Sequence, residues 1–335
     1  MSSLFKNNKV RLLLLLVFVF VSIFLVKKLI FPIGSINYDE PVYIYQAQTY
    51  AEGRIYNEIP QPQESFKQWF LVDKDGKRFG KYSFGTSLLY IPGVILGNTD
   101  VILPIIAVLN VYLMYLLASQ FFRKKEALII SLILFLNPYF IIHSGLILSY
   151  TPSLLFVLTT LLFFTKTIKE KTSLYALATG FFLSMSFATR PLTAVIISIP
   201  LIIIGIYYLY KNFSVYFKLF ILTIIGFLPL FELLLLYNKV LTGNMLTMPF
   251  TEWCSADKMG FGMRTQSWVN QIVPYHFLDG VKNTYEQLKY VFVYLPLMVF
   301  SVFSVMSKKK LILLLALLFI ALHIIFNFFH FIAFT

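Results

Sequence analysis

The sequence predicts an all-α membrane protein that crosses the bilayer many times. Its composition is 59% hydrophobic and only 13% charged, whereas soluble domains are about half apolar and a quarter charged. Apolar runs of spanning length recur along the chain, and the short loops between them are basic. A soluble core could not bury so much apolar surface, so we expect lipid to be the solvent. We therefore treat residues 1–335 as a single membrane domain.

The first apolar run covers residues 10–31 and follows Lys6, Lys9 and Arg11. A run of this kind can be mistaken for a cleaved signal peptide. No small-residue cleavage site follows it, and residues 27–31 extend it. The pattern is typical of an uncleaved signal anchor.

Further apolar runs predict about nine transmembrane helices in total. After the first, they lie near residues 101–122, 127–143, 151–166, 174–190, 191–210, 218–237, 290–306 and 311–331. Residues 84–97 are also apolar, but Pro92 and Gly93 interrupt them. We interpret that piece as interfacial or re-entrant, leading into the second helix.

The loop charges predict that the N-terminus is cytoplasmic. Only two acids, Glu126 and Glu170, accompany the basic residues of the loops that this orientation places inside. Those basic residues are Lys6, Lys9, Arg11, Arg123, Lys124, Lys125, Lys166, Lys169, Lys171, Lys211, Lys218, Lys308, Lys309 and Lys310. Short basic loops mark the cytoplasmic side of membrane proteins.

Two long loops, residues 34–83 and 238–289, are then expected on the outer side. A transporter usually keeps its loops short and carries polar residues at mid-membrane. Here Glu232 is the acid within an apolar run, and it lies near the outer end of that run. The polar chemistry is therefore expected at the outer surface.

The first outer loop begins with a short predicted helix over residues 41–52, which ends at Gly53. Pro41 suits its first turn and Asp39 its N-cap. Tyr43, Ala47 and Tyr50 share one face, as is typical of a helix that lies in the headgroup layer. Residues 70–79 then predict a hairpin with an Asp-Gly turn, which returns the chain to the membrane at residues 80–85.

Two adjacent carboxylates, Asp39 and Glu40, with a Lys returned near them, suit group transfer. A carboxylate can deprotonate an acceptor hydroxyl or amine, and a cation such as Lys81 can hold a phosphate leaving group. The alternative is structural: Asp39 caps the helix and Glu40 is solvated.

Other ligands are not indicated. The net charge of +13 is explained by the cytoplasmic loops, and no basic stripe interleaves with stacking aromatics, so no nucleic-acid partner is predicted. Cys254 is the one cysteine, which excludes an intrachain disulfide and a cysteine-based metal site. The His residues have no metal-ligand spacing, and no metal site is predicted.

The chain resembles the bacterial relatives of the protein O-mannosyltransferases, which are grouped as glycosyltransferase family 39 and have the GT-C fold. The segments that carry the resemblance extend from about residue 30 to 306. They are Tyr38-Asp39-Glu40-Pro41, Ala51-Glu52-Gly53-Arg54, Gly80-Lys81-Tyr82, Leu148-Ser149-Tyr150-Thr151-Pro152, Ala188-Thr189-Arg190-Pro191-Leu192-Thr193, Leu236-Tyr237-Asn238, Leu241-Thr242-Gly243-Asn244 and Met259-Gly260-Phe261-Gly262.

The resemblance implies a glycosyltransferase of the plasma or inner membrane that uses a polyprenyl-phosphate-linked sugar. Its acceptor would be a lipid, a glycan or a protein on the outer face, among membrane lipids. Asp39 looks like the catalytic base, with Glu40 beside it, while Lys81, Tyr82 and Arg190 look like substrate-binding residues near the donor phosphate. No cofactor is assigned, and a divalent cation is left open.

The chain also departs from the family pattern. Relatives usually have Pro-Pro-Gly-His after the Lys-Tyr pair, where this chain has Ser83-Phe84-Gly85-Thr86. Several GT-C enzymes carry a further acid in the second outer loop, yet residues 139–150 contain none. Two alternatives therefore stay open: a transporter of polyprenyl-linked glycans, and a non-catalytic GT-C-like subunit.

Overall fold

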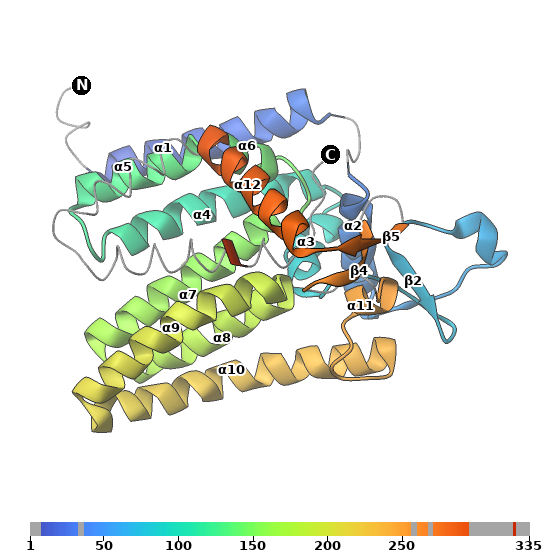
Figure 1. Cartoon of the computed structure of the whole chain (residues 1–335). Coiled ribbons are helices and arrows are strands. Elements are labelled where there is room, and N and C mark those ends of the chain that lie inside the picture. The colour runs from blue at the N-terminus through green and yellow to red at the C-terminus, as the bar shows by residue number, and fades with distance from the viewer. Residues whose placement is uncertain (1–7, 33–36, 256–259, 267–270, 295–323, 326–335) are drawn as a thin grey trace.

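The computed structural model describes residues 8–32, 37–255, 260–266, 271–294 and 324–325, and it is mostly helical. Figure 1 shows long helices running alongside one another, with the short helices and the strands gathered at one end. The longer helices are α1 (Asn8–Leu25), α4 (Ile102–Ala118), α5 (Lys124–Phe135), α7 (Tyr150–Glu170), α8 (Ser173–Thr189), α9 (Pro191–Lys211), α10 (Phe213–Thr242) and α12 (Phe277–Tyr294). The shorter ones are α2 (Asp39–Ala51), α3 (Gly85–Ile95), α6 (Pro138–Ser144) and α11 (Pro249–Trp253).

Five helical segments of the described chain are long and apolar enough to cross a membrane. They are Asn8–Ile30, Thr99–Ala118, Tyr150–Glu170, Pro191–Lys211 and Phe213–Thr242, and the bent pair of α5 and α6 makes up to six. Helix α8 is apolar but shorter. The multi-span character is thus confirmed, whereas the nine spans are not. The predicted helix at 311–331 lies outside the described residues except for 324–325.

The predicted single helix at residues 127–143 is wrong. The chain instead forms α5 and α6, which meet at an angle of 65°. Asn137 starts the second helix, because its Oδ1 accepts a hydrogen bond from the amide of Tyr139 at 2.9 Å, and Pro138 occupies the first turn. Proline cannot continue an existing helix but fits the first turn of a new one.

Connections at the basic end of the bundle contact one another. The Tyr216 hydroxyl donates to the carbonyl of Ile168 at 3.3 Å, and Lys169 donates to the carbonyl of Gln120. The connections that precede α5, α8 and α10 therefore meet at one end. These are loops that the charge pattern assigns to the same side of the membrane.

Helices α8 and α10 approach closely where a glycine on each helix faces the other. A Cβ added at Gly180 would overlap the carbonyl of Thr223, and one added at Gly226 would overlap the carbonyl of Leu177. Small residues allow the backbones of neighbouring membrane helices to come this close.

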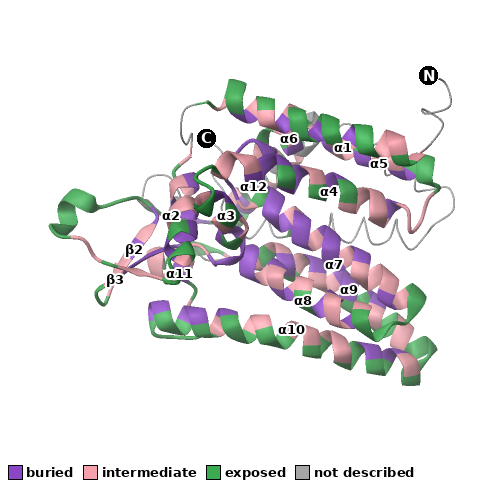
Figure 2. Ribbon diagram, turned by 180° about the vertical axis from the view of Figure 1, so that it is seen from behind, coloured by how far each residue is buried: buried purple, intermediate pink, exposed green. Residues whose placement is uncertain are grey.

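Large apolar side chains remain exposed along the outer helices, among them Phe18 and Val21 on α1 and Leu228 and Leu233 on α10. Figure 2 shows exposed and half-buried residues along both helices. Only 17% of the apolar window of α1 and 11% of that of α10 are buried. Soluble monomers rarely leave such continuous apolar surface in water, whereas lipid would cover it. The composition and the structure therefore agree on a membrane environment.

Helix α2 forms as predicted, but its start and its surroundings differ. The helix begins at Asp39, so Asp39 is not the N-cap; Asn37 instead accepts a hydrogen bond from the Asp39 amide at 3.0 Å through its Oδ1. The face with Tyr43 and Ala47 is 3% and 0% exposed, because it packs against other elements of the protein. The headgroup-layer interpretation of this face was therefore wrong.

The predicted hairpin is confirmed as β2 (Leu71–Lys74) and β3 (Lys77–Gly80), and β1 (Asn57–Glu58) adds to it. Asp75 and Gly76 both have positive φ angles, as a two-residue hairpin turn requires. Lys77 Nζ donates to the carbonyl of Val240 at 2.7 Å, and Lys74 Nζ donates to that of Thr242 at 3.0 Å. The hairpin is thus fastened to the C-terminal end of α10, where carbonyls lack helical partners.

The second long outer loop is shorter and more structured than predicted. Helix α10 continues to Thr242, and α11, β4 (Gly262–Gln266), β5 (Gln271–Tyr275) and most of α12 lie within residues 238–289. Helix α12 begins at Phe277, ahead of the helix predicted at 290–306. Residues 295–306 lie outside the described residues.

Candidate functional site

The candidate site is organised around the first turn of α2. The Tyr82 hydroxyl donates a hydrogen bond to Oδ1 of Asp39. Asp39 is half-buried, whereas its neighbour Glu40 is buried. Two of the predicted site residues, 43 positions apart in the chain, are therefore in direct contact. This contact depends on the hairpin, which returns the chain from α2 to residue 82.

Tyr82 is held on two sides. Its ring stacks on that of Tyr43 with centroids 4.5 Å apart and planes 20° from parallel. Its backbone carbonyl accepts a hydrogen bond from Gln46 Nε2 at 2.7 Å and from the Tyr237 hydroxyl at 3.4 Å. The Gln46 side chain also accepts from Ser87 Oγ at 3.2 Å. A buried, satisfied polar network of this kind fixes one arrangement of its members.

Glu40 has different surroundings from Asp39. Its side chain is 2% exposed, and one carboxylate oxygen accepts a hydrogen bond from the amide of Ile147 at 3.0 Å. Glu40 therefore joins α2 to the segment between α6 and α7. The structural alternative expected Glu40 to be solvated, and this is wrong. The burial of Glu40 and its bond to the Ile147 amide also argue against the predicted catalytic role of Glu40.

Arg190 lies at the same end of the bundle, between α8 and α9. Its guanidinium carbon lies 4.3 Å from the centroid of the Tyr150 ring, which is a cation–π contact. Tyr43 shares a hydrogen bond with Ser149. Burial raises the pKa of Tyr43, the charge of Asp39 also raises it and that of Arg190 lowers it, so both groups lie near this tyrosine. Arg190 thus contacts Tyr150, which follows Ser149, the residue bonded to Tyr43; we call Tyr43, Tyr82 and Tyr150 the aromatic cluster.

Lys81 lies among four aromatic rings. Its Nζ is 3.1 Å from the ring centroid of Phe70, 4.3 Å from that of Trp253, 5.0 Å from that of Tyr82 and 5.4 Å from that of Phe250. Phe70 has a φ of 65°, which is rare for a bulky residue. Residues held in such conformations cluster at functional sites.

The hydroxyls of Tyr43 and Tyr82 stay protonated. Burial raises the pKa of Tyr82 well above its usual value, and the negative charge of Asp39 adds to the shift. Burial likewise raises the pKa of Tyr43. Tyr82 therefore acts as a hydrogen-bond donor to Asp39 across the physiological pH range.

Sequence reasoning missed several contacts of the site. It did not identify Gln46 as a site residue, the pairing of Tyr43 with Tyr82, or the rings of Phe250 and Trp253 around Lys81. One signal was available for Gln46, since it lies four residues before Tyr50 on the aromatic side of α2. Nothing in the sequence associates residues 250 and 253 with Lys81.

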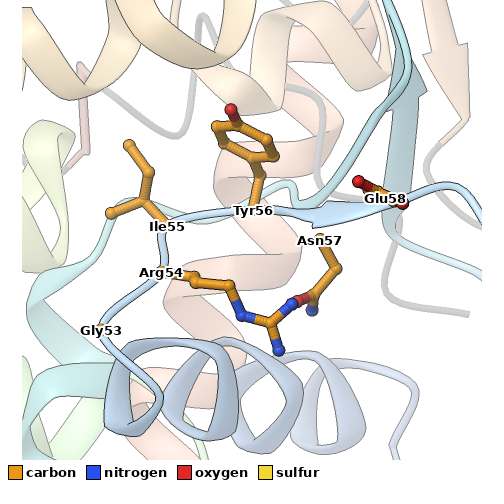
Figure 3. Close-up of a pocket in the computed structure, with 6 residues that line it drawn as sticks. All are labelled: Gly53, Arg54, Ile55, Tyr56, Asn57 and Glu58. Carbon is orange, nitrogen blue, oxygen red and sulfur yellow. The ribbon is translucent and has the colours of Figure 1, made fainter.

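A hollow of about 650 Å³ lies beside the segment that follows α2, away from this site. Figure 3 shows its lining residues, Gly53 to Glu58, next to the end of the helix. A helix of 13 residues is about 20 Å long at 1.5 Å per residue, and Asp39 is at the other end of α2. The hollow is therefore distinct from the aromatic cluster.

Metal ligands are not clustered in the part of the chain that the structure describes: no group of three or more His, Cys, Asp or Glu side chains could hold an ion there. Comparisons with protein-family models, with curated proteins and with solved structures found no match. Function is therefore inferred from the chain's own residues.

Proposed function

We propose that this protein is a membrane glycosyltransferase, of the GT-C type, which transfers a sugar from a polyprenyl-phosphate donor to an acceptor outside the membrane. The observation that carries the proposal is the Asp39–Tyr82 contact at the end of the helical bundle, with Lys81 and Arg190 close by. A half-buried carboxylate with two cations near it has the groups that transfer from a phosphate-linked donor needs: a base for the acceptor proton and positive charge for the leaving phosphate.

The proposed reaction is one inverting displacement. The acceptor oxygen or nitrogen attacks the anomeric carbon, and its proton passes to the Asp39 carboxylate. The bond between the anomeric carbon and the phosphate oxygen breaks, and the polyprenyl phosphate leaves with the bonding electrons. Lys81 and Arg190 stabilise the negative charge on that leaving group.

The test is Asp39→Asn, assayed in membranes with a panel of polyprenyl-phosphate sugars and of lipid, glycan and peptide acceptors. We expect the transfer rate to fall about a hundredfold or more, because removal of a general base typically costs that much. Donor affinity should not change, since the base contacts the acceptor. Asp75→Asn, the same change on the exposed hairpin turn, is the control and should keep full activity.

The alternative of a non-catalytic subunit is favoured by one observation, the engagement of Glu40 with the Ile147 amide, which leaves Asp39 as the candidate base. If Asp39 only accepts the hydrogen bond from Tyr82, Asn should replace it and Asp39→Asn should behave as wild type, because the Asn side-chain oxygen is also an acceptor. A normally inserted Asp39→Asn protein with the wild-type transfer rate would exclude Asp39 as the base.

A further inference from the structure

The hydrogen bond from Tyr82 to Asp39 suggests a role for Tyr82 beyond substrate binding. We propose that Tyr82 is a positioning residue, which orients the Asp39 carboxylate for proton transfer. This inference rests on the proposed function. It adds to that function a division of labour between the two Asp39 carboxylate oxygens: one is held by Tyr82, and the other reacts.

The geometry around Tyr82 supports this role. Its hydroxyl donates to Oδ1 of Asp39, its ring stacks on Tyr43, and its carbonyl is bonded to Gln46 at 2.7 Å. Gln46 and Tyr43 both belong to α2, the helix whose first turn carries Asp39. The Tyr82 hydroxyl and the Asp39 carboxylate are therefore both held by the same helix, α2. A carboxylate on a helix turn would otherwise rotate about its side-chain torsions.

The chemistry follows from this arrangement. Because Tyr82 keeps its proton, it occupies Oδ1 as a donor and cannot itself take the acceptor's proton. Oδ2 is then the oxygen we assign to the acceptor proton. A base must lie within hydrogen-bond reach of that proton, and small misplacement is costly to the rate. The hydroxyl of Tyr82 thus contributes to the chemical step without touching the donor.

The test is Tyr82→Phe, which removes the hydroxyl and retains the ring that stacks on Tyr43. We expect kcat to fall about ten- to a hundredfold, since misplacement of about 1 Å can cost a hundredfold, with KM for the donor lipid within about twofold of wild type. In an Asp39→Asn background, Tyr82→Phe should cause no further loss, because the group that it positions is gone.

Tyr45→Phe is the matched control. Tyr45 is also on α2, and its hydroxyl is bonded to Asn57 at 2.8 Å, away from Asp39. We expect this variant to keep its kcat. If the Tyr82 hydroxyl were merely structural, Tyr82→Phe would keep its kcat as Tyr45→Phe does, or its loss of kcat would add to the loss caused by Asp39→Asn.

Each other outcome overturns the inference. Wild-type kcat in Tyr82→Phe would show that the hydroxyl is dispensable. A rise in donor KM with constant kcat would make Tyr82 a donor-binding residue, and additive losses in the double variant would make it independent of Asp39. If Asp39→Asn is fully active, or if wild-type protein transfers no sugar from any donor tested, the proposed function fails and the role of Tyr82 fails with it.

Discussion

Lys81 brings a positive charge into an almost completely enclosed aromatic environment at the candidate site. Its side chain is 6% exposed, and the rings of Phe70, Tyr82, Phe250 and Trp253 surround its Nζ. Cation–π contacts compensate part of the desolvation of such an ammonium group. Two of these rings come from α11, so Lys81 also joins the first long loop, residues 34–83, to the second long loop, residues 238–289.

Lys81→Ala should weaken binding of the donor lipid as well as the transfer rate. A cation that contacts the donor phosphate does so in the ground state and in the transition state alike, so both donor KM and kcat/KM should worsen. Titration with a fluorescent polyprenyl-phosphate sugar measures the first effect. Lys67→Ala, which removes an exposed charge from the same loop, is the control. An unchanged donor affinity in Lys81→Ala would remove Lys81 from the phosphate site.

The hairpin should loosen in acid because of one ion pair. Arg78 donates to both oxygens of Asp73 at 2.6 Å, and this bonding lowers the pKa of the Asp73 carboxyl. A depressed pKa contributes stability above the unfolded value of about 3.9, and that stability is lost as the pH falls through the folded value. Amide exchange in β2 and β3, corrected for its intrinsic pH dependence, should therefore accelerate below about pH 4.

Asp73→Asn should reproduce this loosening at neutral pH, with a loss of about 1.5–3 kcal/mol of local stability, the range for hydrogen bonds to charged groups. Asp75→Asn is the control: the turn position has a φ of 49°, which Asn adopts readily. Equal amide exchange in the Asp73→Asn, Asp75→Asn and wild-type proteins would contradict the role of the ion pair.

At the scale of the elements, the packing of α8 on α10 depends on two glycines. Gly226→Ala places a methyl group against the carbonyl of Leu177, so the helices must separate. We expect a loss of about 1–3 kcal/mol, as for other overpacked sites, and a lower melting temperature in detergent. Gly205→Ala on α9 is the control, because a Cβ there meets no atom within 4 Å.

The two glycine variants should therefore shift stability in opposite directions. Alanine favours a helix over glycine by about 1 kcal/mol, so Gly205→Ala should be neutral or slightly stabilising. If Gly226→Ala melts at the same temperature as Gly205→Ala, the close approach of α8 and α10 is not a requirement of the fold.

At the scale of the whole molecule, the sidedness of the bundle can be tested in intact cells. Ser65→Cys lies in the first outer loop and Lys124→Cys at the start of α5, and both positions are exposed. In a Cys254→Ser background, we expect a membrane-impermeant thiol reagent to label position 65 but not position 124, because the charge pattern predicts that the basic loops are cytoplasmic. Labelling of position 124 alone would show that the protein has the opposite orientation in the membrane.

The elements that sequence reasoning anticipated are those with local signals. The hairpin follows from Asp75-Gly76 between two short strands, and the spanning helices follow from unbroken apolar runs. The bend after α5 had its own local signal in Asn137-Pro138, which the apolar run outweighed. Helix α2 starts at Asp39, two residues before the predicted start at Pro41, and the Asn37 side chain accepts a hydrogen bond from the Asp39 amide.

The sequence alone determined the membrane environment, the predicted sidedness and the region of the candidate site, because each depends on composition or on residues close together in the chain. Only the tertiary structure decided what Asp39, Glu40 and Lys81 contact. Tyr82 reaches Asp39 from 43 residues away, the Ile147 amide reaches Glu40 from 107, and Trp253 lies over Lys81 from the second outer loop. Such contacts arise when packed helices bring distant segments together, and spacing along the chain does not encode that packing.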